Sequence, residues 1–282
     1  MNFRRHFAST LLSRGLVVLV LAVILVVTIF PLYWIAVTSL KTIPETYLWP
    51  PTFWPKELTF EGYSKVWTYS NFAKMFLNSV IVAVSSTVLS VVLASLAAYG
   101  FSRFKFKGHK IVLFFFLFTQ MVPAILLLLP YFIMMRKLGL INSYTALILA
   151  YTSFSLPFCT WMLKGFFDSI PTDIDEAAMI DGCGRFQTLI EVILPLALPG
   201  IAATTLFGFL VAWNHYLFAM GLTTTPEMYT LPVGIAALNG EFRVAWNELM
   251  AGAIIASLPA LVLYLLLQKW FVKGLTAGAV KG

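Results

Sequence analysis

The sequence predicts an all-α polytopic membrane protein with six transmembrane helices. Its composition is 60% hydrophobic and 11% charged, with a mean hydropathy of +0.88, whereas soluble globular chains carry about 25% charged residues. The chain also contains six windows without Asp, Glu, Lys or Arg that are long enough to cross about 30 Å of hydrocarbon as helices. Helices are required because an open sheet would leave backbone groups unpaired in lipid.

The spacing of charges locates the predicted spans. The windows are residues 15–40, 75–102, 111–135, 138–163, 192–226 and 249–268. The fifth window is too long for one span, so we expect its helix to start near Pro199 and to reach about Met220. The third and fourth windows are kept apart by Arg136-Lys137 and by the turn-prone Gly139.

The distribution of Lys and Arg predicts the orientation. With both termini in the cytoplasm, the inner segments hold twelve of the 19 basic residues and the outer segments hold seven. We therefore predict a cytoplasmic tail at 1–14, a six-helix transmembrane domain at 15–272 and a second cytoplasmic tail at 273–282. The apolar run after residue 14 is long and lacks a convincing cleavage site, so we expect it to be retained as the first span.

The loop at 164–198, between the fourth and fifth windows, has a net charge of opposite sign to that of the whole chain. It contains six of the twelve acidic residues and two basic ones, and is therefore net −4 in a protein that is net +7. Its charged residues are Lys164, Asp168, Asp173, Asp175, Glu176, Asp181, Arg185 and Glu191. Anionic lipid would attract the opposite charge, so the loop favours docking onto a protein.

Local patterns predict a short helix in this loop. Thr172 can cap a helix whose third residue is Asp175, and acidic residues near a helix start are favoured by the helix dipole. Ala177 and Ala178 are small enough to let a partner approach closely, and Gly182 can end the helix in a left-handed conformation. The same pattern also fits a well-capped connecting helix with no partner.

A second amphipathic stretch is expected after this short helix. Its apolar residues are Phe186, Leu189, Ile190 and Ile193. We expect it to lie along the membrane and to lead through Pro195 into the fifth span.

Missing motifs limit the function classes. The chain has no Gly-x-x-x-x-Gly-Lys-Ser/Thr phosphate loop and no His-Glu-x-x-His pattern, and its three histidines are scattered. We expect neither a disulfide nor a metal site from Cys159 and Cys183. The charge-free windows argue against a proton-coupled carrier and, more weakly, against a sodium-coupled one. A membrane-embedded enzyme would need a cluster of catalytic or metal-binding side chains, and the His and Cys positions do not form one.

The loop also carries a family resemblance. Glu176-Ala177-Ala178, three residues, Gly182, nine residues and then Val192-Ile193-Leu194-Pro195 resemble the cytoplasmic loop of binding-protein-dependent ABC importer permeases, with Val192 in place of Ile. Segments 97–103, 170–182, 212–214, 230–234 and 274–282 are similar to the carbohydrate branch of that family. Within this branch the chain resembles the shorter, six-helix permease of maltose-type importers.

The resemblance implies a function in an ATP-driven importer that moves a sugar or oligosaccharide into the cytoplasm by alternating access. The loop would form a cytoplasmic coupling helix that sits on an ATPase subunit. Its ATPase-coupling residues would be Glu176, Ala177, Ala178, Asp181, Gly182, Leu194 and Pro195. The chain would not be an enzyme itself, because ATP and Mg would be bound by partner subunits, and it would hold no cofactor or metal.

The implied partners are a second homologous permease chain, two ATPase subunits and an extracytoplasmic solute-binding protein. The location would be the cytoplasmic membrane of a bacterium or an archaeon, with lipid around the chain and no nucleic acid bound. A secondary carrier, or an importer permease for a non-sugar solute, stays open as an alternative.

Polar residues within the spans are candidates for the translocation path. Gln120, Asn214 and His215 stand out, because amides can hydrogen-bond sugar hydroxyls and the nearby Pro123 loosens its helix. The simpler interpretation of each residue is a hydrogen bond between helices, worth about 1 kcal/mol.

Overall fold

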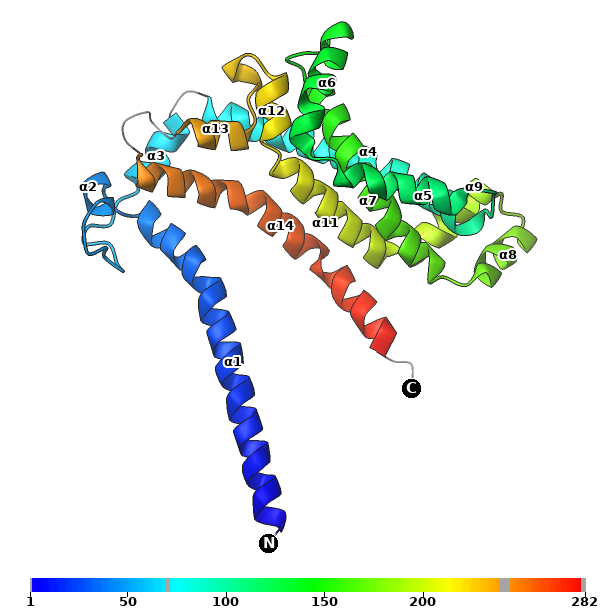
Figure 1. Ribbon diagram of the computed structural model, residues 1–282, viewed down its shortest axis with the longest axis horizontal. Coiled ribbons are helices and arrows are strands. Elements are labelled where there is room, and N and C mark those ends of the chain that lie inside the picture. The colour runs from blue at the N-terminus through cyan, green and yellow to red at the C-terminus, as the bar shows by residue number, and fades with distance from the viewer. Residues whose placement is uncertain (1, 69–70, 239–243, 280–282) are drawn as a thin grey trace. The chain divides into compact units, whose positions relative to one another are not determined.

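The computed structural model describes the backbone of residues 2–68, 71–238 and 244–279, with side chains for the part of these ranges between 15 and 271. The regular elements in these ranges are helices (Figure 1). The short helices are α2 (Ile43–Thr46), α3 (Glu61–Thr68), α8 (Thr172–Ile180), α9 (Arg185–Gln187), η2 (Thr188–Ile193), α10 (Leu194–Leu196), α12 (Leu217–Leu222), η3 (Pro226–Met228) and α13 (Leu231–Ala237). The remaining helices contain the apolar windows.

Four helices are long and apolar enough to cross a membrane by themselves. They are α1 (Asn2–Ser39), α4 (Phe72–Arg103), α7 (Tyr144–Asp168) and α14 (Trp246–Ala279). Two further stretches qualify as bent pairs, His109–Met121 with Ala124–Lys137 at 99° and Arg185–Leu196 with Leu198–Trp213 at 85°. The described part of the chain therefore has six spans if each bent pair is counted as one.

The third span is broken at its middle. It consists of α5 (His109–Phe118), the short 3-10 helix η1 (Thr119–Met121) and α6 (Ala124–Lys137). The bend lies at Val122 and Pro123, because proline lacks an amide hydrogen and disfavours helical geometry in the residue before it. The fourth helix begins at Tyr144 and not at 138, since Gly139 and Asn142 have positive φ and the Ser143 side chain accepts a hydrogen bond from the Ala146 amide at 3.3 Å.

The helix predicted to start near Pro199 does begin there but ends early. Helix α11 (Leu198–Trp213) starts beside Pro199, and the prediction that it continues to Met220 is wrong because the chain leaves the helix before α12. The Asn214 side chain donates to the Leu210 carbonyl oxygen at 2.9 Å, and the Tyr151 hydroxyl donates to the His215 carbonyl oxygen at 3.0 Å. Side chains thus bond backbone groups where the helix is interrupted.

Both predicted tails contain helix. Helix α1 begins at Asn2, within the predicted tail at 1–14, and α14 runs on to Ala279, past the predicted boundary at 272. Residues 1 and 280–282 lie outside the described residues. The side of the membrane on which each tail lies stays a prediction.

The described chain forms two compact units, whose boundary falls inside α14 after Ile255. The first unit contains α1, α2, α3 and the beginning of α14, and the second contains α4 to α13 with the rest of α14. Within the second unit α4, α7 and α11 pack side by side, with α8 and α9 at one end and α12 at the other (Figure 1).

Small residues allow these three helices to approach closely. The Ser90 and Ser155 hydroxyls share a hydrogen bond of 2.6 Å between α4 and α7. Gly200 of α11 lies against Phe166 of α7, and a side chain there would place its Cβ 2.8 Å from the Phe166 Cβ and still closer to the ring. Close contact of this kind is the usual basis of helix association in lipid, where no hydrophobic driving force acts between helices.

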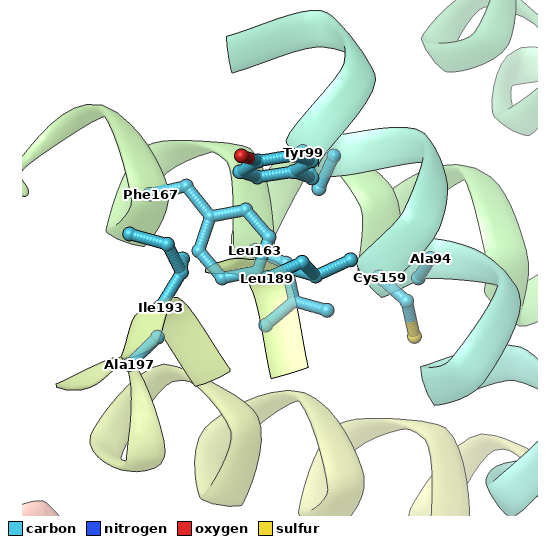
Figure 2. Packing of buried hydrophobic residues seen from close by; sticks show 9 residues of the cluster. Ala94, Tyr99, Cys159, Leu163, Phe167, Leu189, Ile193 and Ala197 are labelled. Carbon is cyan, nitrogen blue, oxygen red and sulfur yellow. The ribbon is translucent and has the colours of Figure 1, made fainter. Parts of the chain in front are cut away.

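The core of the second unit lies next to the acidic loop. Its buried residues are Ala94, Ala98, Tyr99, Cys159, Leu163, Phe167, Leu189, Ile193 and Ala197. Figure 2 shows the side chains of Tyr99, Phe167 and Leu189 directed toward one another, although they come from α4, α7 and η2. The loop between the fourth and fifth spans is therefore part of the packed bundle.

Candidate functional site

The short helix α8 lies in the acidic loop where the sequence predicts it. The residue at its N-cap is Pro171, which makes no side-chain cap, and Thr172 is already the first helical residue. The predicted capping by Thr172 is therefore wrong. Asp173 and Asp175 do lie in the first turn, where negative charge is favoured by the helix dipole.

The end of α8 has the predicted left-handed glycine. Gly182 has φ +92°, and its amide donates to the Met179 carbonyl oxygen at 3.1 Å. The Cys183 amide donates to the Ala178 carbonyl oxygen at 3.0 Å. This pair of bonds is a Schellman motif, which satisfies the last carbonyls of the helix.

A buried ion pair fixes α8 to the end of α4. The Arg103 Nη2 lies 3.0 Å from Asp175 Oδ2, and Arg103 Nε donates to Asp175 Oδ1 at 3.1 Å. Only 8% of the Arg103 side chain and 9% of the Asp175 side chain are exposed. The Tyr99 hydroxyl, one turn earlier on α4, also donates to Asp175 Oδ1 at 3.1 Å. Asp175 Oδ1 thus accepts two hydrogen bonds, while Oδ2 lies within ion-pair distance of the guanidinium without a hydrogen bond of its own.

The same guanidinium binds the end of α7. Arg103 Nη1 donates to the Phe167 carbonyl oxygen at 2.9 Å, and Nη2 donates to the Ile170 carbonyl oxygen at 3.1 Å. Carbonyls at a helix C-terminus lack partners within the helix. Arg103 therefore provides hydrogen bonds for the end of α7 and a counter-charge for α8 at once.

Neighbouring contacts reinforce this junction. Asp168 accepts a hydrogen bond from the Ser102 hydroxyl at 2.7 Å and pairs with Lys164 at 2.5 Å. The Arg185 guanidinium at the start of α9 lies 4.7 Å from the centre of the Phe104 ring. The last turn of α4 thus contacts α7 and α8, and Phe104, the residue after it, contacts α9.

Helix α8 has one inward and one outward face. Asp175 and Ala178 are buried, and the outward side chains are Asp173, Glu176, Ala177 and Ile180, which recur at helical spacing. Ile180 is 86% exposed. Ala178 is covered by this chain, so Ala177 is the alanine that a partner can approach. Asp181 and Gly182 are exposed beside this face.

The stretch after α8 is not amphipathic in the predicted way. Leu189 and Ile193 are buried, whereas Phe186 and Ile190 are exposed, so apolar residues lie on both faces. Residues 188–193 form a π-helix just before Pro195, which has no amide to bond the carbonyl four residues earlier. Pro195 is exposed, and Leu194 packs against the core.

The candidate path residues lie at helix breaks. The Gln120 side chain donates to the Phe154 carbonyl oxygen at 3.0 Å, and the Phe154 ring centre lies 5.6 Å from that of His215. The His215 ring also stacks on Tyr151 at 4.7 Å. Gln120 and His215 are therefore brought together around α7, whereas the Asn214 amide bonds its own helix and is exposed.

Sequence reasoning missed the role of Arg103 and Tyr99. One signal was available: Asp175 lies on the same helix face as the apolar Ala178, and a buried carboxylate needs a cation. Arg103, at the end of a long apolar helix, supplies that cation. In the described residues no group of three His, Cys, Asp or Glu side chains lies in a metal-binding arrangement.

Known proteins resemble the chain over most of its length. It is 40% identical over 261 residues to the sulfoquinovosyl glycerol transport system permease protein of Agrobacterium fabrum, covering 93% of this chain and 92% of that protein. It is 39% identical over 274 residues to the trehalose/maltose transport system permease protein of Thermococcus litoralis, covering 96% and 98%.

The fold is likewise that of a solved importer permease. The chain matches a chain of a bacterial ABC transporter involved in the import of the acidic polysaccharide alginate, with a TM-score of 0.77 and 25% identity over 90% of this chain and 94% of that one. The family pattern described as "binding-protein-dependent transport system inner membrane component" matches residues 90–277. The chain therefore belongs to the family of binding-protein-dependent inner membrane transport components.

Proposed function

We propose that this chain is the transmembrane permease subunit of an ATP-driven ABC importer that moves a sugar or oligosaccharide into the cytoplasm by alternating access. The observation that carries the substrate class is the similarity, over more than nine-tenths of the chain, to permeases named for sulfoquinovosyl glycerol and for trehalose and maltose. The lack of a phosphate loop in the sequence agrees with ATP hydrolysis by separate subunits.

The complete importer would contain a second homologous permease chain, two ATPase subunits that bind ATP and Mg, and an extracytoplasmic solute-binding protein. It would lie in the cytoplasmic membrane of a bacterium or an archaeon, with both termini of this chain in the cytoplasm. The family description supports the binding protein and the inner membrane. The excess of basic residues in the inner segments supports the orientation.

Helix α8 would be the cytoplasmic coupling helix. Its outward face combines the carboxylates of Asp173 and Glu176 with the small Ala177 and the exposed Ile180. Such a face fits a groove of an ATPase subunit with an apolar floor and basic edges. Asp181, Gly182, Leu194 and Pro195 would shape and support this contact from the turn and from the following helix.

The Arg103–Asp175 pair would transmit movement of α8 to the spans. Removing either charge leaves the other buried without its counter-charge, and such a loss costs about 3–5 kcal/mol. The contact is therefore hard to break while the ATPase moves. Because Arg103 also holds the end of α7, a displacement of α8 would carry α4 and α7 with it.

The helix breaks at Gln120 and at Asn214 and His215 would line the translocation path. Interrupted helices are tolerated at membrane depth where they are buried in protein or line a cavity, and they are typical of transport sites. The aromatic rings of Tyr131, Phe154 and His215 lie near one another, with Tyr131 and Phe154 stacked at 5.8 Å. Rings and amides together suit a sugar with apolar faces and hydroxyl edges.

The first prediction concerns the function. We expect the purified chain in liposomes to accumulate no labelled maltose or trehalose under a proton or sodium gradient. The importer assembled with the second permease, ATPase and binding-protein genes adjacent to its own should accumulate a saccharide only when ATP and Mg are present. Gradient-driven accumulation by the chain alone would indicate a secondary carrier, and ATP-driven uptake restricted to non-sugar solutes would refute the substrate class.

The second prediction concerns the outward face of α8. Glu176→Lys should weaken co-purification of the ATPase subunits at least about tenfold, since one hydrogen bond to a charged group contributes about 1.5 kcal/mol or more. Glu191→Lys reverses an exposed charge in the same loop outside α8 and is the matched control.

Gly182→Asp should also uncouple transport, because it forces a side chain into positive φ at a cost of about 1–2 kcal/mol. Gly184→Asp adds the same charge at ordinary φ and should be tolerated. Normal ATPase binding and coupled uptake by both Glu176→Lys and Gly182→Asp would show that α8 is not the coupling helix.

The third prediction concerns the buried ion pair. Asp175→Ala should lower the free energy of unfolding by about 3–5 kcal/mol, measured as thermal unfolding in detergent. Lys164→Ala removes only the more exposed pair with Asp168, leaves the Ser102–Asp168 hydrogen bond in place, and should cost about 1 kcal/mol or less.

The double variant Arg103→Met with Asp175→Leu should regain much of the stability, because an apolar replacement removes both buried charges. It should nevertheless hydrolyse ATP with little uptake. Uptake per ATP equal to that of the unmodified importer would exclude a transmitting role for the pair.

The fourth prediction concerns the path. Gln120→Leu should raise the KM for saccharide uptake about fivefold, which corresponds to the loss of one hydrogen bond of about 1 kcal/mol, while ATPase binding stays normal. Gln187→Leu changes an amide in the coupling loop and should leave the KM unchanged. If Gln120→Leu and His215→Leu both transport with unchanged KM, the path does not run past these breaks.

A further inference from the structure

The first compact unit contains a segment folded around two buried charges. Lys41 is 2% exposed and Glu45 is 6% exposed. The Lys41 Nζ donates to the Thr52 carbonyl oxygen at 2.5 Å. Glu45 Oε1 accepts from the Thr52 hydroxyl at 2.7 Å and from the Lys56 amide at 2.9 Å. The segment from 41 to 56 is therefore held in one shape by its own Lys and Glu.

These two side chains border a cavity of about 320 Å³. The lining residues are Trp34, Thr38, Lys41, Glu45, Thr46, Pro51, Trp246 and Met250. Small-molecule sites span roughly 300–1,000 Å³, so this cavity has the size of the smallest ligands. The end of α1, the α2 segment and the start of α14 all contribute to it.

The cavity has polar groups with unused hydrogen-bonding capacity. The Thr38 Oγ1 is buried and has no hydrogen-bond partner. The Lys41 ammonium can donate three hydrogen bonds, and in the described residues its contacts are the Thr52 carbonyl and the Trp34 ring, whose centre lies 4.7 Å away. A buried hydroxyl without a partner is unfavourable by about 1–3 kcal/mol, and a ligand with hydroxyl groups would remove that penalty.

The charges around the cavity nearly cancel. Burial lowers the pKa of Lys41, although the neighbouring Glu45 charge acts in the opposite direction. Burial would raise the pKa of Glu45, but hydrogen bonds from Thr52 and Lys56, together with the Lys41 charge, hold it below its usual value. An anion would meet the Glu45 carboxylate and a cation would meet the Lys41 ammonium, so a neutral ligand suits the site best.

From this geometry we infer that the cavity binds one pyranose ring of a neutral saccharide. Lys41 and Thr38 would donate to ring hydroxyls, Glu45 and Thr38 would accept from them, and the indole of Trp246 would cover an apolar ring face. This inference rests on the proposed saccharide transport. It adds a binding site formed by residues other than Gln120, Asn214 and His215, on the side that the charge distribution places outside the cell.

The test measures sugar binding to the full chain in nanodiscs, with no binding protein and no nucleotide. The probes are the methyl α-pyranosides of glucose, galactose and mannose, with glucuronate and glucosamine as charged counterparts, and saturation-transfer NMR gives the dissociation constants. At least one neutral pyranoside should bind saturably and more tightly than its charged counterparts.

Variants at the cavity make the test specific. Thr38→Val should weaken binding about fivefold, the effect of one lost hydrogen bond, and Thr38→Ser should retain binding within about twofold because it keeps the hydroxyl. Trp246→Leu should weaken binding about tenfold, because it removes the aromatic face. Thr42→Val is the matched control, since Thr42 does not line the cavity and its side chain makes no capping hydrogen bond at the N-cap of α2, and this variant should bind as the unmodified chain does.

Absence of saturable binding would overturn the inference, as would binding that Thr38→Val and Trp246→Leu leave unchanged. Preferential binding of glucuronate, or displacement of the pyranoside by phosphatidylglycerol, would identify an anion or lipid site instead. Saccharide uptake by the assembled importer without this binding would refute the proposed binding site but not the proposed function. Binding at the cavity with uptake of only non-sugar solutes would refute the proposed function but not the binding site.

Discussion

The guanidinium of Arg103 joins three parts of the chain that are far apart in sequence. It ends α4, pairs with Asp175 of α8 and donates to the carbonyls of Phe167 and Ile170 at the end of α7. A buried ion pair is seldom the most stable filling of a core, because desolvation offsets much of its attraction. Its advantage is direction, since the hydrogen bonds from Arg103 and Tyr99 to Asp175 Oδ1 fix the orientation of α8, which two apolar side chains would leave less defined.

This junction explains why α8 can be both firmly held and available. The helix has nine residues, too few to be stable in isolation. Its fold therefore depends on contacts at both ends and on its inner face: Asp175 on Arg103, Ala178 against the chain, and the Gly182 turn that satisfies the last carbonyls. The opposite face needs no contact within this chain, so Glu176, Ala177 and Ile180 are exposed, and the proposed function assigns them to the ATPase contact.

Sequence reasoning recovered the apolar spans because hydrocarbon requires long runs without charge. It also recovered Gly182, whose positive φ follows from the chemistry of glycine. It failed where tertiary contacts determine at which residue a helix begins or ends. Thr172 is a residue type that often caps helices, but Pro171 occupies the N-cap position and the helix starts one residue earlier than a Thr172 cap requires. The break after Trp213 depends on a hydrogen bond from Tyr151 in another helix, which no local pattern contains.

Arg103 and Asp175 are 72 residues apart, and only the packed bundle shows that they meet. Local patterns gave Asp175 a plausible role as an acidic residue near a helix start. The information that was missing was burial, because a charge on an inward face must have a partner while the same charge on an outward face need not. The coupling residues themselves were identified by resemblance, and their function rests on the proposed docking.

Helix α7 connects the two regions to which the proposed function assigns separate tasks. Its Phe154 carbonyl binds Gln120 at one helix break, and its Phe167 carbonyl binds Arg103 at the junction with α8. These residues are thirteen positions apart, which corresponds to about 20 Å along a helix. Helix α7 stays helical over that distance, although Pro157 lies within it and leaves one backbone hydrogen bond unmade, whereas the third and fifth spans are sharply bent at their breaks. If the proposed function holds, movement of α8 would be transmitted along α7 to the translocation path, and the spans would bend at the helix breaks.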